Sequence, residues 1–184
     1  MAPAPPAPAG ETDVPPLTVD VPALTAVLDG PYSEIRDAVR KQLAAYSSVL
    51  EDAETMTREE YRERVKDVVV EVAATGQTGF GFPKEYGGGE DIGASVAAFE
   101  TLALGDLSVV TKVGVQFGLF GGAILQLGTK PHHDAYLDDL IPGRVLGAFA
   151  MTETGHGSNV QALGTTATYD PDSQEFVIDT PDDR

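Results

Sequence analysis

The spacing of hydrophobic residues changes at Pro142-Gly143, and this change limits the fold classes that the chain can adopt. Before this point, apolar residues recur every three or four positions, which is the spacing of one face of an α-helix. After it, short apolar runs of strand length alternate with turn residues. We therefore expect a mainly α protein, in which a helical domain is followed by the first strands of a β domain.

Five helices are expected before the change. A capping box at Thr57–Glu60 starts the second of them, Asp91 can cap the third, and Asp106 or Ser108 the fourth. Pro131 suits the first turn of the fifth helix, because its missing N–H would be unpaired there anyway. The expected ranges are 33–50, 57–75, 91–104, 106–127 and 131–140.

The fourth expected helix contains a run of 17 uncharged residues between Lys112 and Lys130. Five glycines and two glutamines interrupt this run, so it is too short and too broken for a confident membrane span. A helix that is apolar on all sides is normally buried. We expect it to be the most buried element of the fold.

The chain after Gly143 predicts an apolar strand at 145–151 and a hairpin of 165–169 with 175–180 around the turn sequence Asp170-Pro171-Asp172-Ser173. A two-stranded hairpin alone is marginally stable. We expect the β layer to be incomplete within these 184 residues, and the chain to be part of a longer or split protein.

The N-terminus and the composition narrow the class of protein. Residues 1–31 hold eight of the 13 prolines and are expected to form a flexible leader without a secretory signal, which favours a cytoplasmic location. A net charge of −17 would repel nucleic acid and anionic membranes, so neither is expected as a partner. The absence of cysteine excludes disulfides, thiolate nucleophiles and cysteine-ligated metal sites.

The segment most suggestive of chemistry is 149–159, with the sequence FAMTETGHGSN. A strand ending at Thr152 passes into a glycine-rich loop, in which backbone amides can converge into a nest for phosphate or carbonyl oxygens. Ser158 adds a hydroxyl donor. On these residues alone, an anion or cofactor loop and an ordinary glycine-rich turn both remain open.

This segment resembles the flavin loop of the acyl-CoA dehydrogenase superfamily, and with the following TTATYD it resembles the acyl-CoA oxidase branch. Further similarity lies in 81–88 (GFPKEYGG), 114–120 (GVQFGLF) and 127–129 (LGT). The resemblance implies a helical N-terminal domain at 32–143 and the start of a β-barrel flavin-binding domain at 144–184. His156 stands where the dehydrogenases usually have alanine, which favours the oxidase branch.

The resemblance also implies a cofactor and a reaction. FAD would be held by Met151, Thr152, Glu153, Gly157 and Ser158. The Thr152 hydroxyl would bond the flavin ring beside the Met151 and Glu153 backbone, and Gly157 and Ser158 would approach the pyrophosphate or the acyl-CoA. Acyl-CoA would be desaturated, and O2 would take the electrons to give hydrogen peroxide. The family's catalytic glutamate lies in a C-terminal domain, so no catalytic residue is assigned here.

Several alternatives remain beside this interpretation. The enzyme can be a dehydrogenase that passes electrons to an electron-transfer flavoprotein, or the chain can be a non-catalytic binding module. We expect a homodimer or a complementing C-terminal chain as partner. His132, His133 and His156 lack the carboxylate spacing of a zinc site, and Ser158 near His156 has no triad geometry, so we expect no metal. The segment 79–89 reads as a turn, because it lacks the order of a phosphate loop.

Overall fold

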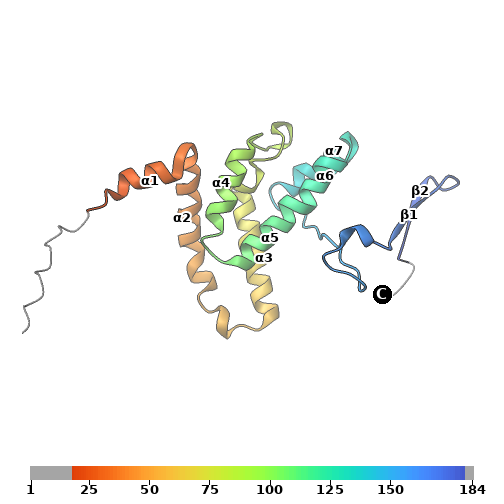
Figure 1. Cartoon of the computed structure of the whole chain (residues 1–184), viewed down its shortest axis with the longest axis horizontal. Helices are drawn as coiled ribbons and strands as arrows, with labels where there is room; N and C mark the ends of the chain where they lie inside the picture. The colour runs from red at the N-terminus through yellow and green to blue at the C-terminus, as the bar shows by residue number, and fades with distance from the viewer. Residues whose placement is uncertain (1–17, 181–184) are drawn as a thin grey trace, which may run out of the picture.

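A computed structural model describes residues 18–180 (Figure 1). The helices are α1 (Val21–Asp29), α2 (Ser33–Leu50), α3 (Arg58–Ala74), α4 (Ile92–Leu102), α5 (Leu107–Val113), α6 (Gly122–Leu127) and α7 (Lys130–Leu140). Between α5 and α6, the segment η5 (Gly114–Gly121) is wound as a π-helix, so α5, η5 and α6 form one continuous rod. The strands are β1 (Thr166–Asp170) and β2 (Glu175–Asp179).

The helix starts follow local capping chemistry and confirm the predicted signals. Thr57 and Glu60 form the capping box, in which the Glu60 carboxylate accepts from the Thr57 amide at 2.8 Å. The Asp91 carboxylate accepts from the Ala94 amide at 2.9 Å. The Asp106 carboxylate accepts from the Ser108 amide at 2.8 Å, so Asp106 rather than Ser108 caps α5.

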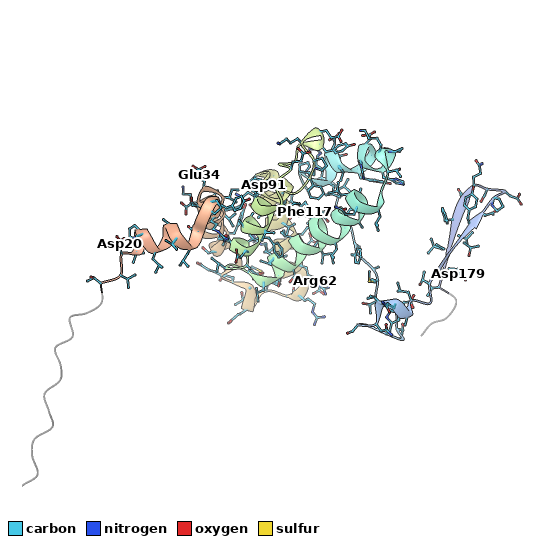
Figure 2. The ribbon with its side chains drawn as sticks, turned by 45° about the horizontal axis from the view of Figure 1, so that its top comes forward. Asp20, Glu34, Arg62, Asp91, Phe117 and Asp179 are labelled. Atoms are coloured by element: carbon cyan, nitrogen blue, oxygen red, sulfur yellow. The ribbon has the colours of Figure 1, made fainter. Side chains whose placement is uncertain are left out.

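The core lies around α3, which packs against α2 and α5. Four valines and one alanine of α3 are buried, and Leu137 and Leu140 of α7 are completely covered. Each fully buried valine or leucine contributes about 1.5–3 kcal/mol relative to an exposed one. The helical domain therefore has a core of its own, and Phe117 of η5 reaches into it (Figure 2).

The predicted burial of the uncharged helix is wrong. About one third of its most apolar stretch is buried, and Leu107, Leu119 and Leu127 are 69%, 48% and 84% exposed. Leu107–Leu127 is long and apolar enough to cross a membrane by length and composition, a test that core helices also pass. One face of this helix packs on the domain, and the other is left uncovered by the residues described.

The flexible leader expected at 1–31 contains a helix, α1, which Asp20 caps by accepting from the Ala23 amide at 3.0 Å. The proline of this helix lies in its first turn, where a missing N–H costs nothing. Asp29 at its end is buried against Arg40 of α2, with two hydrogen bonds of 2.5 and 2.7 Å. Residues 1–17 of the expected leader lie outside the described residues.

The predicted hairpin forms, with β1 and β2 antiparallel in a register that pairs Thr166 with Asp179 and Asp170 with Glu175. It stands apart from the helical domain (Figure 1). The predicted strand at 145–151 does not form, because no strand among residues 18–180 lies beside it to complete a ladder. This segment is irregular and connects α7 to the loop that precedes β1.

Candidate functional site

An apolar cavity of about 600 Å³ opens between α4 and the η5–α6 rod. Its size is in the range of small-molecule sites. Among the described residues that line it, none is charged, and the polar ones are Gln77, Thr78, Ser95 and Gln126. The apolar lining comes mainly from three elements: Val96, Phe99 and Leu102 of α4; Val113 of α5; and Phe117 and Leu119 of η5. This cavity suits an alkyl chain or another uncharged hydrophobic group.

Glycines leave the space for this cavity. Gly114, Gly118 and Gly122 follow one another at four-residue intervals along the rod and line it. A Cβ atom at Gly118 or Gly122 would meet nothing within 4 Å, whereas one at Gly114 would lie 3.3 Å from the Phe99 ring. Phe117, Gly118 and Leu119 of η5 line this cavity in succession. Phe120 is not among the lining residues of this cavity.

The glycine-rich segment 79–89 is a packing loop. The amides of Gly87, Gly88 and Gly89 all donate to carbonyls of the same segment, at 3.0–3.1 Å. They are therefore not free to cradle a phosphate, in agreement with the turn interpretation. The Tyr86 hydroxyl donates to Asp134 of α7 at 2.7 Å and accepts from Lys130 at 2.8 Å, which ties the loop to α7.

The predicted cofactor residues Met151, Thr152 and Glu153 line a second, more polar groove. It is formed by residues 148–154 together with Leu163, Thr165 and Thr180. Met151 and Thr152 are exposed, and the described residues give neither the Thr152 hydroxyl nor the Met151 and Thr152 amides an internal partner. The described part of the groove therefore offers unpaired polar atoms beside apolar side chains, which can bind a ligand that has both polar and apolar parts.

The Glu153 carboxylate bonds within the chain, whereas the predicted cofactor contact is with the Glu153 backbone. It accepts from the Gly164 amide at 2.8 Å, from the Thr165 amide at 2.8 Å and from the Thr165 hydroxyl at 2.6 Å. These bonds, led by the Thr165 hydroxyl, stabilise the anion and lower the pKa of Glu153 from its ordinary 4.5 to about 2. The ring of His156 lies 3.2 Å from the same carboxylate.

Gly157 and Ser158 are exposed and do not line the groove. Amides can converge into a nest where right- and left-handed residues alternate or in a turn. Among residues 18–180, the glycines with positive φ are Gly30, Gly76, Gly87 and Gly143, so Gly155 and Gly157 are not in the left-handed conformation. The structure thus brings three of the five predicted residues together and leaves the other two apart from them.

The three histidines lie in separate surroundings. His132 accepts from the Thr129 amide at 3.1 Å and caps α7, and His133 lies edge-on to the ring of Tyr86. His156 is at Glu153 in the loop before β1. Within residues 18–180, no group of three potential ligands is placed to hold a metal ion.

Gln116 is the buried polar residue that sequence reasoning missed. It lies in η5 with none of its surface exposed, and both ends of its side-chain amide bond the backbone of the segment 145–147. The signal was present in the sequence, since Gln116 and Gln126 are the two strongly polar side chains in a run of uncharged, mainly apolar residues.

Comparisons with known proteins give a consistent result. The family model described as "Acyl-CoA dehydrogenase, N-terminal domain" matches residues 32–144. Acyl-coenzyme A oxidase 2, peroxisomal, from Arabidopsis thaliana is 53% identical over 87 residues, which are 47% of this chain and 13% of that protein. Peroxisomal acyl-coenzyme A oxidase 1 from Cavia porcellus is 31% identical over 162 residues, which are 86% of this chain and 23% of that protein.

Among solved structures, an acyl-CoA dehydrogenase complexed with FAD from Bacillus anthracis is similar in fold, with a TM-score of 0.66 and 25% identity. The likeness covers 80% of this chain and 24% of that one. The chain therefore spans less than a quarter of the length of each of these three proteins.

Proposed function

The chain belongs to the family of acyl-CoA dehydrogenase N-terminal domains, and on this premise we propose that it is part of an FAD-dependent acyl-CoA oxidase. The family resemblance expected from the sequence is thereby confirmed. The observation that carries the oxidase proposal is the identity of about half the aligned residues with named acyl-CoA oxidases. Over comparable shares of the chain, the identity is 31% with the Cavia porcellus oxidase across 86%, 25% with the FAD complex across 80%, and 28% with a glutaryl-CoA dehydrogenase from Mycobacterium smegmatis across 83%.

In this proposal the apolar cavity takes the hydrocarbon part of an acyl-CoA substrate. Burial of each methylene is worth about 0.8 kcal/mol, so a cavity lined by Phe99, Phe117 and Leu119 favours a substrate with a long apolar chain. The absence of charged side chains among its described lining residues supports the same assignment.

FAD fits the groove of Met151 and Thr152 in its chemistry. The Thr152 hydroxyl and the two neighbouring amides are polar groups available at the edge of a surface that Phe149 and Leu163 make apolar. When bound, the flavin supplies the acceptor for the substrate hydride. Thr152 would orient its ring. Glu153 holds this segment in place through Thr165 and is engaged within the chain.

The catalytic base is proposed to lie outside residues 1–184, as the family resemblance implies. A substrate α-proton needs a base within hydrogen-bond reach, and the absence of a positioned base costs a factor of about 10²–10⁴ in rate. We therefore propose that this chain alone does not catalyse the oxidation of acyl-CoA. Three further points stay predictions: that O2 is the electron acceptor, that the partner is a second copy or a complementing chain, and that the location is cytoplasmic. The names of the relatives make the peroxisome the alternative location.

The test combines the chain, FAD and a saturated acyl-CoA without oxygen, with and without the polypeptide encoded next to it. We expect bleaching of the flavin with the second polypeptide, and peroxide once oxygen is admitted. Bleaching without peroxide, but with reduction of an electron-transfer flavoprotein, would identify a dehydrogenase. Acyl-CoA and FAD binding without bleaching in either mixture would identify a non-catalytic module. Rapid bleaching by the chain alone would place the base inside it.

A further inference from the structure

Residues 145–147, in the segment that leads to Thr152, pack against one face of the α5–η5–α6 rod. We call this contact the seat. Three side chains of the rod, four residues apart, touch this segment: Lys112, Gln116 and Phe120. The Lys112 ammonium lies 3.5 Å from the Gly147 carbonyl. The Phe120 ring lies so close to Gly147 that a Cβ atom there would be 2.1 Å from it, so only glycine fits.

Gln116 makes the central contacts of this seat. Its Nε2 donates to the Val145 carbonyl at 2.8 Å, and its Oε1 accepts from the Gly147 amide at 2.9 Å. This pair of bonds to residues i and i+2 is the pattern by which a neighbouring strand satisfies an extended backbone. The side chain thus takes the place of the strand partner that 145–151 lacks, and it is completely buried while doing so.

The rod carries the apolar cavity as well as this seat. Gly114, Gly118 and Gly122 line the cavity, while Gln116 and Phe120, which alternate with them, are not among its lining residues and contact the segment 145–147. The π-helical winding of Gly114–Gly121 contains most of these positions, and such windings occur frequently at functional sites. One rigid element therefore contacts both the cavity and the segment that leads to Thr152.

We propose that Gln116 is a positioning residue that holds the cofactor loop at a fixed place relative to the substrate cavity. The assignment of the loop and the cavity to FAD and acyl-CoA rests on the proposed function. The contacts between Gln116 and residues 145–147 are made within this chain and do not depend on that assignment. Gln116 lines neither the groove nor the cavity, so it acts through Val145 and Gly147, which lie seven and five positions before Thr152 in the sequence.

The first test measures exchange of the Gly147 amide by NMR in the chain as it stands. Gln116→Met keeps the size of the side chain but removes both hydrogen bonds, and Gln116→Glu keeps an acceptor for Gly147. We expect exchange about tenfold faster in Gln116→Met, because two buried hydrogen bonds are lost, and partial protection in Gln116→Glu. If Gln116 only filled space, methionine would preserve protection better than the buried carboxylate, and that order would overturn the proposal.

The second test measures position directly. The chain has no cysteine, so spin labels can be placed at two exposed sites with Leu127→Cys and Asn159→Cys. We expect one narrow distance distribution, which becomes at least twice as wide with Gln116→Met. Equal widths in both, or a broad distribution without the substitution, would overturn the proposal.

Gln42→Met is the matched control for both tests. Gln42 is also a buried glutamine, and it bonds Tyr46 at 3.0 Å within the helical domain. Its loss should lower stability without changing the Gly147 exchange or the label distances. Neither test uses FAD or acyl-CoA, so failure of the proposed function would leave their results unaffected.

Discussion

The carboxylate of Glu153 closes a loop by hydrogen bonding to Thr165: it accepts from the Thr165 amide at 2.8 Å and from the Thr165 hydroxyl at 2.6 Å. Twelve residues separate the two in sequence. The loop between them carries Gly157 and Ser158, and the residues just before it carry Thr152. The shape of the predicted cofactor segment therefore depends on one ionised side chain.

Removing this charge should open the loop. In Glu153→Gln, one acceptor becomes an amide donor facing the donors of Gly164 or Thr165, so we expect the exchange of both amides to rise by tenfold or more. Amide exchange followed by NMR measures this. Glu175→Gln, which changes an exposed carboxylate of β2, is the matched control and should leave both amides unchanged. Unaltered exchange in Glu153→Gln would contradict the role given to the carboxylate.

The same contact should be sensitive to acid. The pKa of Glu153 is lowered to about 2 in the folded chain from an ordinary 4.5. Its contribution is complete above pH 4.5 and is lost as the pH falls from 4.5 through about 2. We expect the Thr165 amide signal to shift over this window and the loop to loosen. If the Thr165 amide signal of Glu153→Gln changed with pH at the same midpoint, the titration of another group would be responsible.

Two glycines should respond to alanine in opposite directions. Gly122 has helical φ and ψ of −62° and −39°, and a Cβ atom there meets nothing within 4 Å, so Gly122→Ala should stabilise by about 0.5–1 kcal/mol. Gly143 has φ of +76°, and a Cβ atom would lie 2.8 Å from Ala73. Gly143→Ala should therefore destabilise by about 1–3 kcal/mol. Urea unfolding compares the two, and equal effects would count against this explanation.

A large side chain in the cavity should exclude long acyl chains. Gly118 faces open space on the cavity wall, so Gly118→Phe can be accommodated by the fold while it fills part of the volume. We expect long-chain acyl-CoA to bind at least tenfold more weakly and short-chain acyl-CoA to be little affected, as measured by titration calorimetry. Gly118→Ala is the control for the loss of glycine. An equal loss for all chain lengths would place the acyl chain elsewhere.

Thr152→Ala tests the cofactor assignment. A hydrogen bond contributes about 0.5–1.5 kcal/mol net, so FAD retention should weaken several-fold rather than disappear, and the flavin absorption spectrum should shift. Flavin titration in the assembled enzyme measures both, with Thr168→Ala, an exposed position of β1 outside the groove, as the control. Unchanged affinity and spectrum would show that the Thr152 hydroxyl does not meet the flavin.

The five expected helices could be read from the sequence, because their signals are local. The bonds of the Thr57–Glu60 box and of the Asp91 and Asp106 caps join residues two or three positions apart, so a short stretch contains all that is needed. The hairpin was equally readable, since its turn lies between strands only four residues apart. The loop at 149–158 could be found by its resemblance to a family, but its contacts could not.

The features that could not be read from the sequence depend on contacts between residues far apart along the chain. The stretch 145–151 has the composition of a strand, yet a strand needs a neighbour, and here Gln116, 29 residues before Val145, supplies the bonds instead. The apolar helix 107–127 is partly uncovered, because burial depends on what packs against it and not on its own composition. The bond from Thr165 to the Glu153 carboxylate was hidden from sequence reasoning for the same reason: hydrogen bonds form between the groups that the fold brings within reach.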